Sequence, residues 1–182
     1  MLERIESGVR RVGLAAACIL IPIQLLVSLS YVVGRQFFDV PVTALQELEW
    51  HCLFALVFLA CGPALLADRH VRIDVWRQRT SATTRARIEI IGFFAGLLPF
   101  CLALIGSGTV AAVDAFLIGE SSRAAMGLPG RWIIKSTVPL GGLLLLAAGG
   151  VLTVRNLRML RTLHAQASAS GGQASGATRG RR

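Results

Sequence analysis

Residues 88–113, which read IEIIGFFAGLLPFCLALIGSGTVAAV, decide the fold class of this chain. Glu89 is the one charged residue in this stretch, and the stretch exceeds the ~20 apolar residues that a helix needs to cross a bilayer. Three further runs, at residues 12–33, 48–67 and 133–154, are also long, apolar and nearly free of charge. Since an open sheet would leave backbone groups unpaired in lipid, the sequence predicts an all-α integral membrane protein with four transmembrane helices.

The overall composition supports this fold class. Hydrophobic residues make up 54% of the 182 residues, and the mean hydropathy is +0.63. The 19 Lys and Arg residues against 10 Asp and Glu residues give a formal net charge of +9. In a soluble protein this excess would indicate a nucleic-acid partner. Here the basic residues flank the apolar runs, so we expect contact with membrane lipid and no nucleic-acid partner.

The basic residues are distributed unevenly over the segments outside the spans. Most of them lie before residue 12, between residues 68 and 87, and after residue 154. The positive-inside rule places these segments in the cytoplasm and the two other loops on the outer side. Four crossings also require both termini to share one side. We therefore expect cytoplasmic termini and interfacial loop segments between the spans.

The chain changes character near its C-terminus. Residues 165–182 consist of Ala, Ser, Gly, Gln, Thr and Arg alone, a composition that cannot bury enough apolar surface to fold. The sequence therefore predicts a four-helix membrane domain over residues 1–164 and a disordered cytoplasmic tail over residues 165–182. Arg155, Arg158 and Arg161 precede the tail, where we expect them to contact anionic lipid.

The sequence lacks the residue patterns of catalysis and of metal or cofactor binding. The 4 cysteines fall inside the spans without a C-x-x-C pair, as is typical of small apolar packing residues. We find neither a Ser, His and Asp set nor a glycine-rich phosphate loop. We therefore expect no enzymatic activity, no bound metal and no cofactor.

Few polar residues lie deep in the spans. A path for ions or acids usually places charged side chains inside the membrane, whereas the deepest polar residues here are Gln24, Ser28, Ser107 and Thr109. These residues serve equally well in hydrogen bonds between helices. The pattern disfavours a stand-alone exporter or channel built as a homo-oligomer, which remains the alternative interpretation.

Small residues recur at helical spacing in the last two spans. Gly92 and Gly96 form a G-x-x-x-G pattern, and Gly141 and Gly142 lie in the final span. Such residues let helix backbones approach closely. Both packing within the chain and packing against a partner are compatible with the pattern.

Several short blocks resemble a known family. Residues 45–51 (LQELEWH) and 70–74 (HVRID), with the span between them, resemble the small membrane subunit, or DctQ-like component, of tripartite ATP-independent periplasmic (TRAP) transporters. Residues 120–122 (ESS), 127–129 (GLP) and 139–141 (PLG) resemble the third loop and the start of the last helix of that family. The HVRID block is the most specific of these.

This resemblance implies a function by association. The small subunit of the family is a scaffold for a large DctM-like permease, which holds the substrate and ion sites. A periplasmic solute-binding protein, the DctP-like component, delivers the substrate. The resemblance implies a multi-pass protein of the bacterial inner membrane and ion-gradient-driven uptake of organic acids such as dicarboxylates, 2-oxo acids or sialic acids.

The resemblance and the expected topology together suggest two groups of site residues. On the outer side, we expect the solute-binding protein to dock near Arg35, Glu47, Glu49, Glu120 and Arg131. On the cytoplasmic side, His70, Arg72 and Asp74 are expected to hold their loop against the permease or lipid headgroups. His70 and Asp74 would face the same side of a helix, because they lie one turn apart.

Overall fold

The computed structural model describes residues 1–37, 43–67, 81–124 and 126–179 of the chain. All regular elements in this described part are helical, which confirms the predicted fold class. The helices are α1 (Leu2–Phe37), α2 (Thr43–Leu66), α4 (Ala82–Gly92), the π-helix η1 (Phe93–Leu97), α5 (Leu98–Leu117) and α6 (Trp132–Arg179).

Four helical stretches are long and apolar enough to cross a membrane, as the sequence predicts. Three of them extend beyond the predicted apolar runs at both ends, and the second begins earlier and ends at Leu66, one residue short of its run. The added turns carry most of the charged residues of the helices, which suits the polar surface of a bilayer. The stretches are Leu2–Phe37, Thr43–Leu66, Ala82–Leu117 and Trp132–Leu163.

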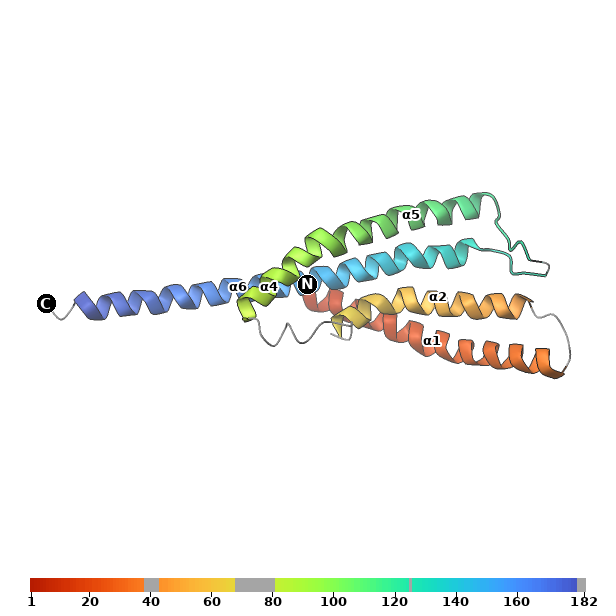
Figure 1. Ribbon diagram of the computed structural model, residues 1–182, viewed down its shortest axis with the longest axis horizontal. Helices are drawn as coiled ribbons and strands as arrows, with labels where there is room; N and C mark the ends of the chain where they lie inside the picture. Colours follow the sequence, from red (N-terminus) through yellow and green to blue (C-terminus); the bar gives the residue numbers. More distant parts are fainter. Residues whose placement is uncertain (38–42, 68–80, 125, 180–182) are drawn as a thin grey trace.

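The four stretches lie in a row and not in a closed bundle. α1 packs on α2, α2 on α6, and α6 on α5, so that α1 and α5 form the two edges (Figure 1). In the most apolar window of each stretch, 39% of the residues are buried in α6, against 11% in α1 and 6% in Ala82–Leu117. α6 is therefore the central helix, and the edge helices keep most of their apolar surface exposed.

Glycines bring α2 and α6 into backbone contact. A Cβ atom at Gly62 would lie 2.7 Å from the carbonyl oxygen of Leu144, and one at Gly141 would lie 2.7 Å from the carbonyl oxygen of Phe58. No larger residue fits at either position unless the two helices separate. This reciprocal contact forms the centre of the row.

The two outer helix pairs join through a glycine opposite a proline. A Cβ at Gly13 in α1 would lie 2.1 Å from Cγ of Pro63 in α2. A Cβ at Gly108 in α5 would lie 2.9 Å from Cδ of Pro139 in α6. The proline rings thus fill the space that each glycine leaves, which is how small residues promote helix packing in membranes.

The third stretch contains a π-helical turn that the sequence pattern did not predict. The backbone N–H of Leu98 bonds to the carbonyl oxygen of Phe93, five residues earlier. Pro99 follows directly, and a proline ring in a regular α-helix clashes with the carbonyl group four residues before it. The wider π turn relieves this clash and keeps the helix continuous.

Figure 1 shows α6 extending well past the ends of the other helices, as far as Arg179. Its final turns include residues for which the composition predicts disorder. A helix rich in Gly and Ser that packs on no neighbouring helix is marginal in water. The assignment of residues 165–182 to a disordered tail stays a prediction.

Candidate docking surfaces

The row of helices has two ends, which carry different polar contacts. The "loop end" contains Phe37 at the end of α1, Thr43 at the start of α2, and the segment 118–131 between α5 and α6. The "terminal end" contains the N-terminus, the end of α2 and the start of α4 (Figure 1). The structure brings all five residues predicted for docking to the loop end, namely Arg35, Glu47, Glu49, Glu120 and Arg131.

Segment 118–131 folds back on itself through backbone hydrogen bonds. The N–H of Ser122 donates to the carbonyl of Leu128 at 3.0 Å, and the N–H of Arg131 donates to the carbonyl of Glu120 at 3.1 Å. Met126 adopts a positive φ of 62°, which is uncommon for a residue with a side chain. Its side chain is 79% exposed. The fold of this segment therefore presents an apolar side chain to the surroundings at the loop end.

Glu47 holds this segment against the start of α2. The hydroxyl of Ser122 donates to Oε1 of Glu47, and the backbone N–H of Leu128 donates to Oε2 at 2.8 Å. A Cβ at Gly127 would lie 2.4 Å from Ser122 and 3.0 Å from Glu47 Oε2. Glu47 is thus a clamp between two segments, and its carboxylate is already occupied within the chain.

Glu120 makes a second clamp, between segment 118–131 and α6. Lys135 donates a hydrogen bond to Oε2 of Glu120, and Arg131 Nε lies 3.8 Å from Oε1. The Lys135 hydrogen bond lowers the pKa of the Glu120 carboxyl below its ordinary value, and the charges of Lys135, Arg131 and Arg123 act in the same direction. The carboxylate is therefore ionised at neutral pH.

Glu49 joins α2 to α1 and not to the loop segment. The hydroxyl of Ser28 donates a hydrogen bond of 2.6 Å to Oε1 of Glu49. The carboxylate also borders a cavity of about 260 Å³ between the two helices. This cavity is lined by Gln24, Tyr31, Gln46, Glu49, Trp50 and Leu53.

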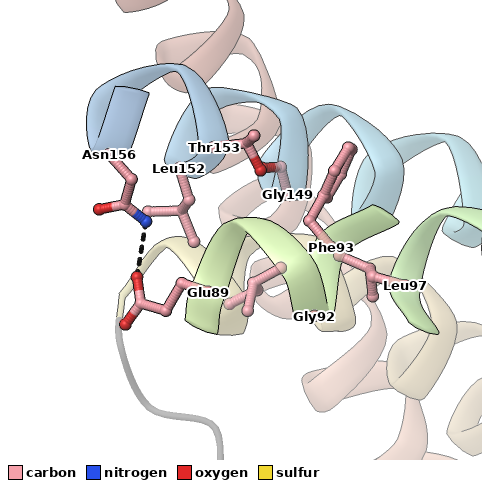
Figure 2. A pocket seen from close by; sticks show the side chains of 9 residues that line it. Glu89, Gly92, Phe93, Leu97, Gly149, Leu152, Thr153 and Asn156 are labelled. Carbon is pink, nitrogen blue, oxygen red and sulfur yellow. Dashed lines mark hydrogen bonds between the residues drawn. The ribbon is translucent and has the colours of Figure 1, made fainter. Parts of the chain in front are cut away.

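At the terminal end, the described residues include polar contacts between helices. In one, Glu6 of α1 accepts a hydrogen bond from Arg155 of α6. In another, Nδ2 of Asn156 donates to Oε2 of Glu89 at 2.7 Å, at the edge of a cavity of about 140 Å³ (Figure 2). The predicted anchor residues His70, Arg72 and Asp74 lie outside the described residues.

The predicted packing glycines have two different environments. Gly141 meets the backbone of α2, and a Cβ at Gly142 would lie 3.0 Å from Ile105 in α5. At Gly92 and Gly96, a Cβ would meet no atom within 4 Å in the part of the chain that is described. Gly92 instead lines the cavity in Figure 2. Of these two predicted pairs, the pair in the last span is the one that brings helices together among the described residues.

The sequence interpretation missed the partners of the acidic residues. Ser122 and Lys135 were not identified as partners of Glu47 and Glu120, and the contact between Glu6 and Arg155 was not foreseen. A usable signal exists in the sequence, because an acidic side chain at the end of a membrane span needs a partner or water. The identity of each partner depends on which helices are neighbours.

The described residues contain no group of three His, Cys, Asp or Glu side chains that could hold a metal ion. Four carboxylates at the two ends join helices to each other or to segment 118–131, namely Glu6, Glu47, Glu89 and Glu120. These contacts stabilise the packing of the helices and of segment 118–131.

Comparison with known proteins identifies the family of the chain. The family model described as "Tripartite ATP-independent periplasmic transporters, DctQ component" matches residues 24–159, which is well over half of the chain. No curated protein matches the chain. The match includes two of the four apolar helices in full, most of the last one and the second half of the first. It also includes the segments that form the loop end and the contact between Glu89 and Asn156. The chain belongs to the DctQ family, and it is a multi-pass component of a TRAP transporter.

Proposed function

We propose that this chain is the small scaffold subunit of a TRAP transporter in the bacterial inner membrane. In this proposal it pairs with a large DctM-like permease and works with a DctP-like periplasmic solute-binding protein. The complex takes up organic acids, such as dicarboxylates, 2-oxo acids or sialic acids, with energy from an ion gradient. The observation that carries the proposal is the family match over residues 24–159.

The open row of helices supports a scaffold role. The two edge helices, α1 and α5, expose large apolar side chains over most of their length. Lipid can cover such surfaces, but a row also offers a broad face on which another membrane protein can pack. The small subunit would in this way widen the stationary part of the permease.

The two ends of the row have different roles in this proposal. The excess of basic residues near the terminal end favours a cytoplasmic location for that end. The loop end then faces the periplasm, where Arg35, Glu49, Arg131 and segment 118–131 are available to the solute-binding protein. His70, Arg72 and Asp74 would hold the cytoplasmic loop against the permease or lipid headgroups.

Co-purification tests the proposal directly. The tagged chain is expressed in its native membrane, extracted in a mild detergent, and its partners are identified by mass spectrometry. We expect a large multi-helix permease in stoichiometric amount. A lone protein or a homo-oligomer, under conditions that preserve other membrane complexes, would contradict the proposal and favour the stand-alone exporter or channel.

A further inference from the structure

A groove between α4 and α6 lies at the terminal end of the row, just beyond the contact between Glu89 and Asn156 in Figure 2. On α6, Leu160 follows Asn156 by about one helical turn. The groove, which we call the "α4–α6 groove", measures about 390 Å³. The described residues that line it are Arg87, Leu157, Leu160 and Arg161.

The two arginines of this groove carry positive charge that the described residues do not neutralise. No ion pair joins Arg87 or Arg161 to a carboxylate in the part of the chain that the structure describes. Glu89 accepts a hydrogen bond from Asn156 instead. Like charges beside one groove repel each other, and a guanidinium group binds a phosphate group through paired hydrogen bonds. The charge of the groove therefore matches a phosphate group.

The rest of the lining is apolar, and exposed apolar side chains continue from it into the membrane. Leu157, which lines the groove, is 39% exposed. Ile91 and Phe94 follow Arg87 at intervals of four and seven residues, so they share its helix face. They are 65% and 57% exposed. Since apolar surface gains free energy by contact with hydrocarbon, a phosphate group joined to acyl chains matches the groove better than a free phosphate ion.

The groove also lies at the level where a membrane carries its phosphate groups. Arg87 is five residues inside the start of the stretch Ala82–Leu117, and Arg161 is two residues before the end of Trp132–Leu163. These offsets correspond to roughly 8 Å and 3 Å along helices that rise 1.5 Å per residue. Arginine side chains near the ends of membrane helices reach the headgroup layer, while their neighbours deeper in the membrane contact acyl chains.

We propose that the α4–α6 groove binds a phospholipid whose headgroup carries a net negative charge. The phosphate group lies between the guanidinium groups of Arg87 and Arg161, and an acyl chain packs on Leu157. This site differs from the general lipid contact expected for residues 155–161, because α4 supplies one of its two charges and Arg155 is paired with Glu6. The inference goes beyond the proposed function and requires only that the chain lies in a membrane.

The first test measures lipid retention by native mass spectrometry. The full chain is purified in mild detergent with equal amounts of phosphatidylglycerol, which is anionic, and phosphatidylcholine, which has no net charge. In Arg87→Gln combined with Arg161→Gln, we expect the ratio of bound phosphatidylglycerol to phosphatidylcholine to fall about tenfold. The matched control, Arg4→Gln combined with Arg11→Gln, removes the same charge from α1 at the same end and should keep the ratio. Equal ratios in the two double variants would overturn the inference.

Two further measurements separate charge from folding and lipid from free phosphate. Arg87→Lys combined with Arg161→Lys keeps both charges, so it should retain most of the preference for phosphatidylglycerol. A loss as large as that of the glutamine variant would show that the charge of the groove does not hold the lipid. Inorganic phosphate in large excess should leave phosphatidylglycerol bound to the wild-type chain. Its displacement by inorganic phosphate would assign the groove to a free anion and overturn the inference.

The last test identifies the occupant of the groove in the native membrane. A photoreactive amino acid replaces Leu157 in the groove, and the matched control carries it at Leu143 in the middle of the same membrane span, where the side chain is 51% exposed. We expect the lipids cross-linked at position 157 to be enriched several-fold in anionic phospholipid over those at position 143. Equal lipid composition at both positions would overturn the inference. A cross-link from position 157 to protein, whether a partner or residues 68–80 of this chain, would overturn it too.

Discussion

The centre of the row and its two edges are held in different ways. At the centre, α2 and α6 touch through Gly62 and Gly141, and each glycine faces a backbone carbonyl of the other helix. At the edges, α5 packs on α6, and α1 packs mainly on α2 and touches α6 only near its N-terminus, where Val9 meets Val151. Both edge helices leave most of their apolar surface exposed. The helices at the centre thus complete their packing contacts within the chain, whereas the edge helices leave apolar surface for lipid or for a partner. This difference suits a protein whose fold and assembly depend on separate surfaces.

The largest effect is expected for a substitution at the centre. In Gly141→Val, the new Cβ would lie 2.7 Å from the carbonyl oxygen of Phe58, so α2 and α6 must separate. Overpacking of this kind costs about 1–3 kcal/mol. We expect a clearly lower unfolding temperature in detergent, measured by the fluorescence of the tryptophan residues.

Gly106→Val is the matched control for that substitution. Gly106 lies in the edge helix α5, and a Cβ there meets no atom within 4 Å in the described residues. Its unfolding temperature should stay near that of the wild type. Equal destabilisation by both substitutions would contradict the distinction between centre and edge.

A smaller effect is expected for the Glu47 clamp at the loop end. In Glu47→Leu, the hydroxyl of Ser122 and the backbone N–H of Leu128 lose their acceptor. Segment 118–131 should then open more often, and trypsin should cleave after Arg123 several-fold faster, as local opening exposes the chain. The control Glu3→Leu should leave the rate of cleavage after Arg123 unchanged. An unchanged rate in Glu47→Leu would show that Glu47 does not hold segment 118–131.

This clamp changes how docking to the solute-binding protein is tested. Reversal of Glu47 or Glu120 alters the loop end itself, so Arg35 in the last turn of α1 is the cleaner position. A charge at the rim of an interface mainly affects the rate of association. We expect Arg35→Gln to slow association of the binding protein by a few-fold at low salt, measured by surface plasmon resonance with the reconstituted complex. An unchanged rate would exclude Arg35 from the docking surface.

The smallest effect is expected for the pH dependence of the Glu120 clamp. The pKa of Glu120 lies below its ordinary value of 4.5, chiefly because Lys135 donates a hydrogen bond to it. Its contribution to stability is therefore complete above pH 4.5, and it is lost as the pH falls through the lowered pKa of the folded state. Hydrogen exchange of segment 118–131, corrected for the intrinsic rate, should increase over that range. Glu120→Gln should reduce this pH dependence and leave the part that comes from Glu47, which also holds the segment through its carboxylate. An unchanged dependence would assign it to a group other than Glu120.

The candidate site was predictable in part. The five docking residues were placed at one end from the topology alone, and the structure brings them to the same end of the row. Their different roles were not predictable, because the roles of Glu47, Glu49 and Glu120 depend on partners that lie far from them in the sequence. Ser122, Ser28 and Lys135 become those partners only when α1, α2 and α6 lie side by side.

The sequence by itself determined the four apolar helices and the family. Length and hydropathy suffice for this, because every backbone group in lipid must be paired within a helix. Only the tertiary structure decided the order of helices in the row and the contacts of Gly62, Gly141 and Glu47. These depend on which helices become neighbours, and apolar helices in lipid have no hydrophobic preference for one neighbour over another. The shapes of small residues and the pairing of a few polar groups make that choice.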